Sequence, residues 1–360
     1  MHKKLYIPGP VELSPEILQI LSTPMIGHRT KEYSELHARV KSKLQQLLST
    51  KNKVFLSTSS GTGVMEACAR NCVSNRMLSL ICGEFGERWY EIARANGKQV
   101  DAFHVDLGTA IKPEMVRQCL ASGKYDAVAL THNETSTGVM NPLAAIGAVM
   151  QEFPDIIFMV DAVSSMGGAK INVDEWGIDV CLASTQKGFG LPPGFAVFSV
   201  SDKAMRKATT VPHRGYYFDF LTFNEYDEKN QTPTTPSLPH LFALDYQLTK
   251  WFNEGIERRY ERHIQMAQAC RSWAKNSGFA LFAEPGYESV TLTTVNNTRG
   301  ISVANLNAEL GKRGYMISAG YGRLKEQTFR IAHTGDISLA DLNEVLGVMD
   351  ETLRVGQVHA

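Results

Sequence analysis

The stretch Ile156-Ile157-Phe158-Met159-Val160-Asp161 decides the fold, because it is a short apolar strand that ends on an acid. A run without polar alternation is typical of a strand that is covered on both faces. Similar apolar runs lie at 54–56, 78–81, 127–130 and 180–183, and segments with helical features lie at 64–71, 86–95 and 143–149. This alternation predicts an α/β fold with a mostly parallel sheet between two layers of helices.

The alternation of predicted strands and helices ends after Thr209. A polar, proline-bearing stretch at 230–239 leads into long helices at about 241–274, and the remainder reads strand, helix, strand, strand, helix. That order is typical of a smaller α+β domain. Because 360 residues are long for one domain, we divide the chain into a large domain that ends at residue 236 and a small domain at 237–360.

The composition narrows the classes of partner. Lys plus Arg and Asp plus Glu both number 37, so the formal net charge is zero and nothing indicates nucleic acid. The six cysteines are scattered, as buried thiols are in a reducing compartment, and we expect no metal site. The N-terminus lacks the apolar core of a signal peptide, and no apolar run approaches the length of a membrane span. We therefore expect a cytoplasmic protein without a membrane partner.

A lysine follows the strand at 180–183, in Ser184-Thr185-Gln186-Lys187-Gly188-Phe189-Gly190. Lys187 would thus lie at the carboxyl edge of the sheet, where open α/β folds bind ligands. The nearby glycines let a bulky group approach the backbone. Taken alone, the segment is equally compatible with a lysine on a surface loop.

An acid ends a neighbouring strand at the same sheet edge. Asp161 precedes Ala162-Val163-Ser164, and a buried carboxylate there needs a partner. A pyridinium nitrogen is such a partner, because the carboxylate would hold the ring protonated as an electron sink. Capping of the next helix is the alternative interpretation.

A polar turn, Ser57-Thr58-Ser59-Ser60-Gly61-Thr62-Gly63, precedes the helix predicted at 64–71. Hydroxyls and free N–H groups at a helix N-terminus suit a phosphate. The turn is not a dinucleotide fingerprint, since Glu66 stands where the third glycine belongs, and this disfavours a dehydrogenase. It is not a Walker loop either, because no Gly-Lys-Ser/Thr follows.

Together, these three features match one cofactor, pyridoxal 5'-phosphate. Lys187 would bind its aldehyde, Asp161 its ring nitrogen and Ser60-Gly61-Thr62 its phosphate. Nearly the whole chain resembles the class V aminotransferases of fold type I, nearest to the alanine–glyoxylate and serine–pyruvate branch. The resemblance implies a mostly parallel sheet of the seven-stranded type in a large domain at 21–236. It also implies that residues 1–20 fold over the active site.

The resemblance also assigns roles to further residues. Phe85, in Gly83-Glu84-Phe85-Gly86-Glu87-Arg88, matches the ring that stacks on the cofactor, where Trp is common. Thr232-Pro233-Thr234-Thr235-Pro236 resembles the segment that reaches the phosphate of the neighbouring subunit, with Thr232 at a position where Tyr is often found. The cofactor contacts implied in this way are Ser60, Gly61, Thr62, Phe85, Thr135, Asp161, Val163, Gln186, Lys187, Thr232 and Thr235.

Three residues are implied at the substrate. Arg330, in Phe329-Arg330-Ile331, matches the arginine that clamps the substrate carboxylate through two parallel hydrogen bonds. Gly9, in Ile7-Pro8-Gly9-Pro10, belongs to the segment over the active site. Arg29 either reaches a second acidic group of the substrate or faces solvent beside His28.

The resemblance implies a ping-pong transaminase in which Lys187 is the general base and acid. It would move an amino group from a small amino acid, alanine or serine, to a 2-oxo acid, glyoxylate or pyruvate. The family also implies a homodimer with shared active sites.

Three alternatives remain beside this interpretation. Phosphoserine or 2-aminoethylphosphonate is an alternative substrate, which Arg29 and Arg214 leave open. A cysteine desulfurase-like lyase is disfavoured, because that family stacks a histidine where Phe85 stands and needs a mobile cysteine in the C-terminal domain. A non-catalytic scaffold is disfavoured because Lys187, Asp161 and Arg330 are all present.

Overall fold

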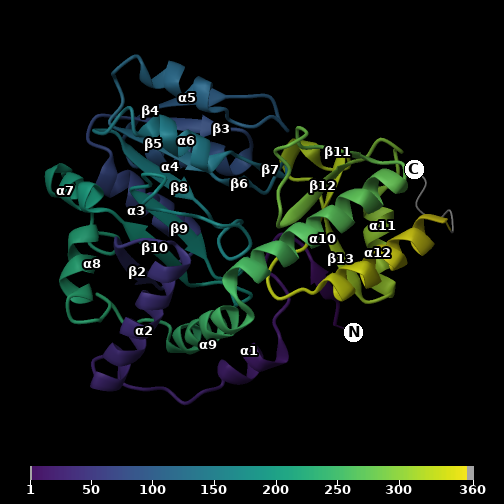
Figure 1. Ribbon diagram of the computed structural model, residues 1–360, viewed down its shortest axis with the longest axis horizontal. Coiled ribbons are helices and arrows are strands. Elements are labelled where there is room, and N and C mark those ends of the chain that lie inside the picture. Colours follow the sequence, from purple (N-terminus) through teal and green to yellow (C-terminus); the bar gives the residue numbers. More distant parts are fainter. Residues whose placement is uncertain (1, 355–360) are drawn as a thin grey trace.

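The computed structural model describes residues 2–354 of the 360-residue chain, which form two bodies, each built on its own sheet (Figure 1). In the large body, seven strands lie in the order β2 (Lys53–Ser57), β10 (Ala196–Val200), β9 (Val180–Ser184), β8 (Ile157–Asp161), β5 (Ala127–Thr131), β3 (Arg76–Ile81) and β4 (Gln99–His104). Strand β10 is antiparallel to both its neighbours, and the strands from β9 to β4 are parallel. The predicted mostly parallel α/β sheet is therefore confirmed.

The apolar strands are explained by helices on both faces of this sheet. In β8, Phe158 and Val160 point into one apolar cluster, and Ile157 and Met159 point into another. The helices of this body are α1 (Pro15–Ile20), α2 (Lys31–Leu47), α3 (Gly61–Cys72), α4 (Glu84–Ala95), α5 (Pro113–Leu120), α6 (Leu143–Met150), α7 (Asp202–Thr210), α8 (Phe220–Asp227) and α9 (Leu238–Glu254). A hairpin of two short strands, β6 (Asn133–Glu134) and β7 (Val139–Met140), follows β5.

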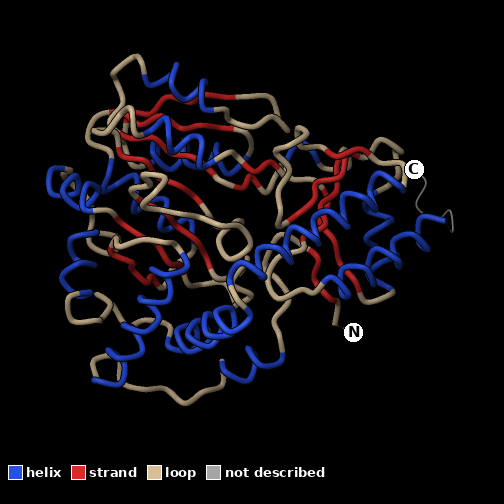
Figure 2. The backbone as a smooth tube through the Cα atoms, in the orientation of Figure 1, coloured by secondary structure: helices blue, strands red, loops and turns tan. Residues whose placement is uncertain are grey.

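The small body has a five-stranded sheet, which forms the second group of strands in Figure 2. Its order is β1 (Lys4–Tyr6), β13 (Tyr315–Ala319), β14 (Thr328–Ala332), β12 (Leu292–Asn296) and β11 (Ala280–Leu281). Helices α10 (Ile256–Asn276), α11 (Val303–Lys312) and α12 (Leu339–Arg354) and a 3-10 turn, η1 (Gly322–Leu324), complete it. The predicted strand, helix, strand, strand, helix order is confirmed by β12, α11, β13, β14 and α12.

The segments that join the two bodies carry information on the domain boundaries. Helix α9 packs on α2, and its residues Leu241, Leu244 and Leu248 belong to a cluster of the large sheet. Helix α10 then leads into the small body (Figure 1), and β1 pairs with β13 of the small sheet. The division at residues 20 and 236 stays a prediction, and this packing favours a large body that extends to the end of α9. Between residues 2 and 354, no helix is both long and apolar enough to cross a membrane.

Candidate active site

Lys187 lies three residues after the end of β9, and Asp161 is the last residue of β8, the parallel neighbour of β9. Both therefore lie at the carboxyl edge of the large sheet, as predicted for a ligand site. Burial, together with the positive charges of Arg330 and Arg88, lowers the pKa of the Lys187 amine to about 8, and the negative charge of Asp161 opposes this. A lysine of this kind is partly unprotonated near neutral pH, and its amine is a nucleophile and a base.

The Asp161 carboxylate is buried and only half engaged. Its Oδ1 atom accepts a hydrogen bond from the Val163 N–H at 2.8 Å, and Oδ2 has no hydrogen-bond partner among residues 2–354. Burial raises the pKa of Asp161 to about 6; the Val163 bond opposes this, and the nearby charge of Glu134 adds to it. A buried acid with one free oxygen suits a positively charged ring nitrogen.

The predicted phosphate cradle is the N-terminus of α3. Ser60 caps this helix, and its Oγ atom accepts from Gly63 N at 3.4 Å. The N–H groups of Gly61 and Thr62 have no hydrogen-bond partner among the described residues, as is usual in a first helical turn. A Cβ atom at Gly61 would lie 2.8 Å from Val163 Cγ2, so no larger residue fits there. Two free N–H groups at a helix N-terminus can bind an anion.

Gln186 also lies at this edge, beside Lys187. Its Oε1 atom accepts a hydrogen bond from the Ser184 hydroxyl at 2.5 Å. This bond fixes the side chain that the sequence placed on the phosphate side of the site.

Phe85 is held by a carboxylate that the sequence analysis did not single out. Glu134 is fully buried, and its Oε2 atom accepts from the N–H groups of Phe85 and Gly86, both at 3.1 Å. Its Oε1 atom accepts from the Ser136 N–H at 3.1 Å and from the Ser136 hydroxyl at 2.6 Å. Burial raises the pKa of Glu134, although these hydrogen bonds oppose it. The carboxylate thereby fixes the first turn of α4, which carries Phe85.

Tyr321 and Arg88 complete the wall around Phe85. The ring centroids of Phe85 and Tyr321 are 5.9 Å apart, and the Arg88 guanidinium lies 4.8 Å from the Phe85 centroid. Arg88 Nη2 donates to the Tyr321 hydroxyl at 3.4 Å, and Arg330 lies 5.6 Å from the Tyr321 ring. Sequence reasoning missed Tyr321; its only signal is an aromatic residue between Gly320 and Gly322.

Arg330, on β14, brings a guanidinium from the small body to Lys187. Its Nε atom donates to Ala319 O at 3.1 Å and its Nη1 atom to Thr135 O at 3.2 Å, while Nη2 has no partner within the described chain. Burial lowers the pKa of Arg330 to about 10, so it stays charged at neutral pH. The side chain of Thr135 bonds the Ser164 hydroxyl at 2.7 Å. Arg330 is thus oriented by two carbonyl oxygens and keeps one donor group for an anion.

The N-terminal segment lies over Lys187. Gly9 has a φ of +138°, and a Cβ atom there would lie 2.7 Å from Lys187 Cδ and 2.9 Å from Gln186 O. Only glycine fits at such a distance and dihedral angle. A small cavity beneath the segment is lined by Pro8, Thr135, Ser164, Lys187, Thr291, Leu292 and Thr334.

Arg29, Thr232 and Thr235 do not join this group within one chain. Arg29 donates to Thr232 O at 2.8 Å and to Pro233 O at 3.3 Å, and its guanidinium lies 5.1 Å from the Tyr226 ring centroid. Thr232 is buried, and its hydroxyl donates to the carbonyl of residue 234 at 2.8 Å. Thr235 is exposed.

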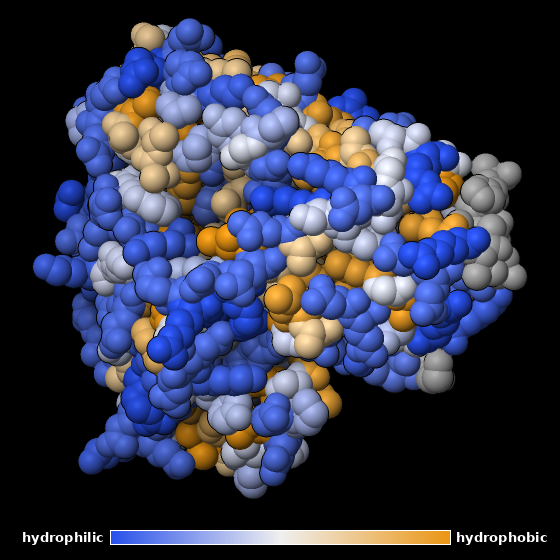
Figure 3. Space-filling model, turned by 45° about the vertical axis from the view of Figure 1, so that its right-hand side comes forward, coloured by the Kyte–Doolittle hydropathy of each residue, from blue (hydrophilic) through white to orange (hydrophobic). Residues whose placement is uncertain are grey.

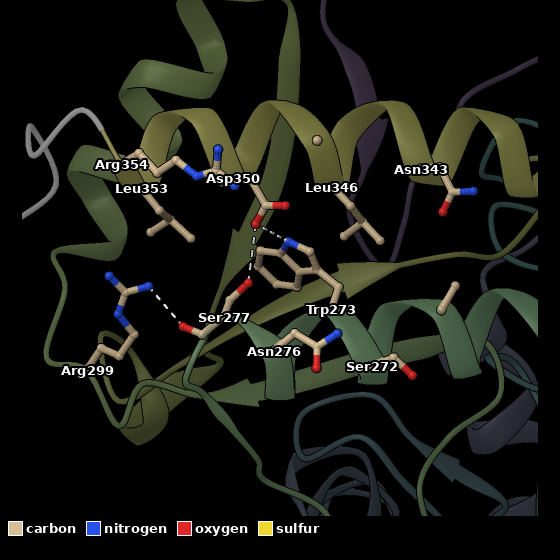
Figure 4. Close-up of a pocket in the computed structure, with 12 residues that line it drawn as sticks. Ser272, Trp273, Asn276, Ser277, Arg299, Asn343, Leu346, Asp350, Leu353 and Arg354 are labelled. Carbon is tan, nitrogen blue, oxygen red and sulfur yellow. Dashed lines mark hydrogen bonds between the residues drawn. The ribbon is translucent and has the colours of Figure 1, made fainter.

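A separate pocket lies between α10 and α12 (Figure 4). Its Asp350 carboxylate already accepts from Trp273 Nε1 at 2.8 Å and from the Ser277 hydroxyl at 3.3 Å. Arg299 donates to Ser277 O at 3.0 Å. Asp350 and Arg299 thus have partners within this pocket, whereas the groups that lie together around Lys187, namely Lys187, Asp161 and Arg330, are buried and have strongly shifted pKa values.

Known proteins resemble this chain over nearly its whole length. The model of the class V aminotransferase family matches residues 18–342. An uncharacterized aminotransferase of Methanocaldococcus jannaschii is 38% identical over 341 residues, 92% of this chain and 88% of that protein. A serine–glyoxylate aminotransferase of Methylorubrum extorquens is 30% identical over 349 residues, 93% of this chain and 87% of that protein. The crystal structure of an alanine–glyoxylate aminotransferase from Nostoc sp. superposes with a TM-score of 0.93 at 26% identity, covering 98% of this chain and 96% of that one.

The chain therefore belongs to the class V aminotransferase family and is a transaminase with the fold type I architecture. Membership of this family implies pyridoxal 5'-phosphate as the cofactor. The residues at the sheet edge fit that group: a buried amine of lowered pKa, a buried acid with a free oxygen and two free N–H groups at a helix N-terminus.

Proposed function

We propose that Lys187 binds the cofactor, that Asp161 faces the ring nitrogen, and that Ser60, Gly61 and Thr62 hold the phosphate. The observation that carries this proposal is the position of Lys187 at the carboxyl edge of the sheet, where burial lowers the pKa of its amine to about 8. When bound, the cofactor supplies an electron sink for the carbon that loses or gains a proton. Phe85, held by Glu134, would cover one face of its ring.

The other steps belong to the side chains of the protein. The free Nη2 group of Arg330 takes the substrate carboxylate and so fixes the amino acid in one orientation. The amine of the incoming amino acid would displace Lys187 from the cofactor, and the freed Lys187 amine would then carry a proton away from the substrate α-carbon and return it, as general base and acid. Pro8 and Gly9 close the cavity and keep water from the reacting atoms.

The proposed donor is a small amino acid, alanine or serine, and the proposed acceptor is glyoxylate or pyruvate. Two similar proteins support this proposal by their names, which are serine–glyoxylate and alanine–glyoxylate aminotransferase. Arg29 binds backbone carbonyls of the 232–233 segment, which disfavours its use for a phosphorylated substrate within the same chain. In this scheme the first product leaves before the second substrate binds, so the kinetics are ping-pong.

A homodimer with shared active sites is part of the proposal. Thr235 is exposed and would reach the phosphate bound by a second subunit. Large apolar side chains are exposed near the N-terminus, with Met25 at 66% and Leu18 at 55%, and Figure 3 shows apolar patches in the middle and along the lower edge of one face. All six cysteines are free thiols, which supports a cytoplasmic location.

An absorbance spectrum tests the proposed function. The purified protein, incubated with pyridoxal phosphate, is expected to show a visible band that L-alanine or L-serine abolishes, and addition of glyoxylate or pyruvate restores it. Lys187→Met is the matched control and should show no such cycle. Absence of the band in the wild-type protein would contradict the cofactor site, and a band that neither amino acid changes would contradict the donors.

A further inference from the structure

A buried arginine outside the group around Lys187 contacts three loops of the active site. Arg259 lies in the first turn of α10, after Gly255, and its side chain is fully buried. Its Nε atom donates to Gly167 O at 2.6 Å, and its Nη2 atom donates to Gly188 O and to Gly335 O, both at 2.9 Å. One guanidinium therefore binds three carbonyl oxygens from three distant segments.

All three carbonyls belong to glycines, and each glycine is required where it lies. A Cβ atom added at residue 167 would lie 2.5 Å from Trp251 Cη2. A Cβ atom added at residue 188 would lie 2.2 Å from Met166 O. Gly335 has a φ of +80°, which L side chains rarely adopt. The backbone at these points is shaped so that its carbonyls converge on the guanidinium.

Each of the three loops carries part of the active site. Gly167 follows Asp161 in the loop after β8, Gly188 is the residue after Lys187, and Gly335 is next to Thr334, which lines the small cavity at the end of β14. These loops come from both bodies of the molecule. Arg259 therefore connects the loop that carries Lys187 (the lysine loop) with the loop that follows Asp161 (the acid loop). It also connects both loops with the segment after β14, the strand that carries Arg330.

The surroundings keep Arg259 charged and oriented. Burial lowers its pKa to about 10, and Asp336, whose Oδ1 atom is 3.4 Å from Nη1, opposes this. The guanidinium lies 4.0 Å from the Trp251 ring centroid, and the same ring stacks on Phe189 of the lysine loop at 5.2 Å. A planar group with donors on several nitrogens and an aromatic neighbour is a role that Lys cannot fill.

We propose that Arg259 is a positioning residue for transamination. It fixes the lysine loop relative to the acid loop and to strand β14, which carries Arg330. The inference rests on the proposed role of Lys187 but not on the identity of the substrate. Arg259 touches neither the substrate nor the reacting atoms, so it acts only through the three loops. Loss of Arg259 would therefore change the position of Lys187 without removing any residue of the active site.

The test compares Arg259→Lys with Arg262→Lys. Arg262 lies on the same helix and bonds Glu254 at 2.9 Å and Ile337 O at 2.7 Å, without contact to the lysine loop. Because displacement of a reacting group by about 1 Å lowers rates by about 100-fold, Arg259→Lys should lower kcat about that much. Arg262→Lys should stay within about twofold of the wild type. Unchanged kcat in Arg259→Lys would overturn the proposal.

A second readout separates positioning from a loss of folding. The pH dependence of Lys187 labelling by an amine reagent, measured by peptide mass spectrometry on the cofactor-free full chain, should have a midpoint near 8 in the wild type. The charges that act on Lys187 come from Arg330, Asp161 and Arg88, so a changed midpoint in Arg259→Lys reports solvation of the loop. We expect the midpoint to move toward 10.5, and an unmoved midpoint would overturn the proposal.

A variant that keeps the arginine covers failure of Arg259→Lys to fold. Trp251→Phe removes part of the ring that packs on both the Arg259 guanidinium and Phe189 of the lysine loop. The guanidinium is then held less firmly against its three carbonyls, so a smaller move of the midpoint in the same direction is expected. An unmoved midpoint in Trp251→Phe would then overturn the proposal. If the labelling midpoint moves in Arg259→Lys but the wild type transaminates no donor, the proposed function fails, and the effect of Arg259 on the placement of Lys187 is still supported.

Discussion

Lys187→Met should make the cofactor-free protein more stable at neutral pH while it abolishes transamination. The wild-type amine is buried beside Arg330, and its pKa is about 8, compared with 10.5 for an ordinary lysine. A tenfold change in proton affinity corresponds to about 1.4 kcal/mol, so burial of the charged amine destabilises the folded state by about 3 kcal/mol at pH 7. Methionine has a similar shape and no charge, and it removes this penalty.

The sign of the pH dependence gives the prediction a second measurable feature. Between pH 8 and pH 10.5 the unfolded chain holds the Lys187 proton and the folded chain has lost it, so the free energy of unfolding rises with pH in this window. Lys187→Met lacks that contribution. The difference between the two proteins should therefore be about 3 kcal/mol at pH 7, shrink above pH 8 and vanish near pH 10.5.

Urea unfolding of both proteins at several pH values measures this difference. The cofactor must be removed first, because any ligand of the folded state stabilises it by mass action. Lys51→Met, at an exposed position, is the control and should leave the free energy of unfolding within about 0.5 kcal/mol of the wild type. A Lys187→Met protein that is no more stable at pH 7, or a gap that does not depend on pH, would refute the reasoning.

Three further substitutions test the groups around Lys187. Asp161→Asn should lower kcat by about 10- to 100-fold, because a charged hydrogen bond of about 1.5–3 kcal/mol to the ring nitrogen is lost. Steady-state kinetics with the cofactor still bound measure this effect, and an unchanged kcat would contradict it. Arg330→Lys should lower kcat/KM for the amino donor by a similar factor, since Lys cannot make two parallel hydrogen bonds to the substrate carboxylate. Initial rates at varied donor concentration measure this ratio. An unchanged ratio would exclude Arg330 as the group that binds the carboxylate. Glu134→Gln should lower the free energy of unfolding by about 3 kcal/mol, because an amide has one acceptor oxygen where the carboxylate has two. Its NH2 group would therefore face either the N–H groups of Phe85 and Gly86 or the N–H and hydroxyl of Ser136, which lose their acceptor. A loss below about 1 kcal/mol in urea would show that Glu134 is dispensable for α4.

The large sheet could be predicted because its signal is local. The inner parallel strands β5, β8 and β9 are short apolar runs, as in 157–160, since helices cover both faces of the sheet. The caps of α1 and α2 are equally local features, because the hydroxyls of Ser14 and Thr30 accept from the N–H groups of Ile17 and Tyr33, three residues further on. Strands β4 and β10 were both missed. Strand β4 lies at the edge of the sheet, where apolar and polar residues mix, whereas β10 is a buried run that the predicted strands did not include.

Strand β1 could not be predicted for a different reason. Its three residues, Lys4–Tyr6, pair with Tyr315–Ile317, about as far along the chain as two segments can be. A strand of this length has no periodicity, and its only stabilisation is the edge of a sheet that forms elsewhere. The resemblance to a family placed this segment near the active site but did not indicate that it belongs to the small sheet.

Within the site, the residues that bear chemistry were easier to predict than those that hold them. Asp161 ends an apolar strand and Lys187 follows another by three residues, so both their chemistry and their place in the fold can be predicted from the sequence. Glu134 and Arg259 act through backbone groups of other segments, and nothing near them in the sequence indicates which N–H or C=O they meet. Positioning residues of this kind become visible only when the loops are assembled.

The electrostatics of the site explain why its residues violate the usual rules for buried groups. The pKa of Asp161 is raised to about 6, because burial is compensated by only one N–H bond, and that of Lys187 is lowered to about 8. Each group alone disfavours the folded state, which is the arrangement expected where a ligand supplies the missing partners. A positive ring nitrogen beside Asp161 and an aldehyde that consumes the Lys187 amine would relieve both penalties at once. The cofactor then contributes to the stability of the fold as well as to catalysis. Removal of the cofactor should therefore destabilise the wild-type protein more than it destabilises the Lys187→Met protein, in which one of the two penalties is already absent.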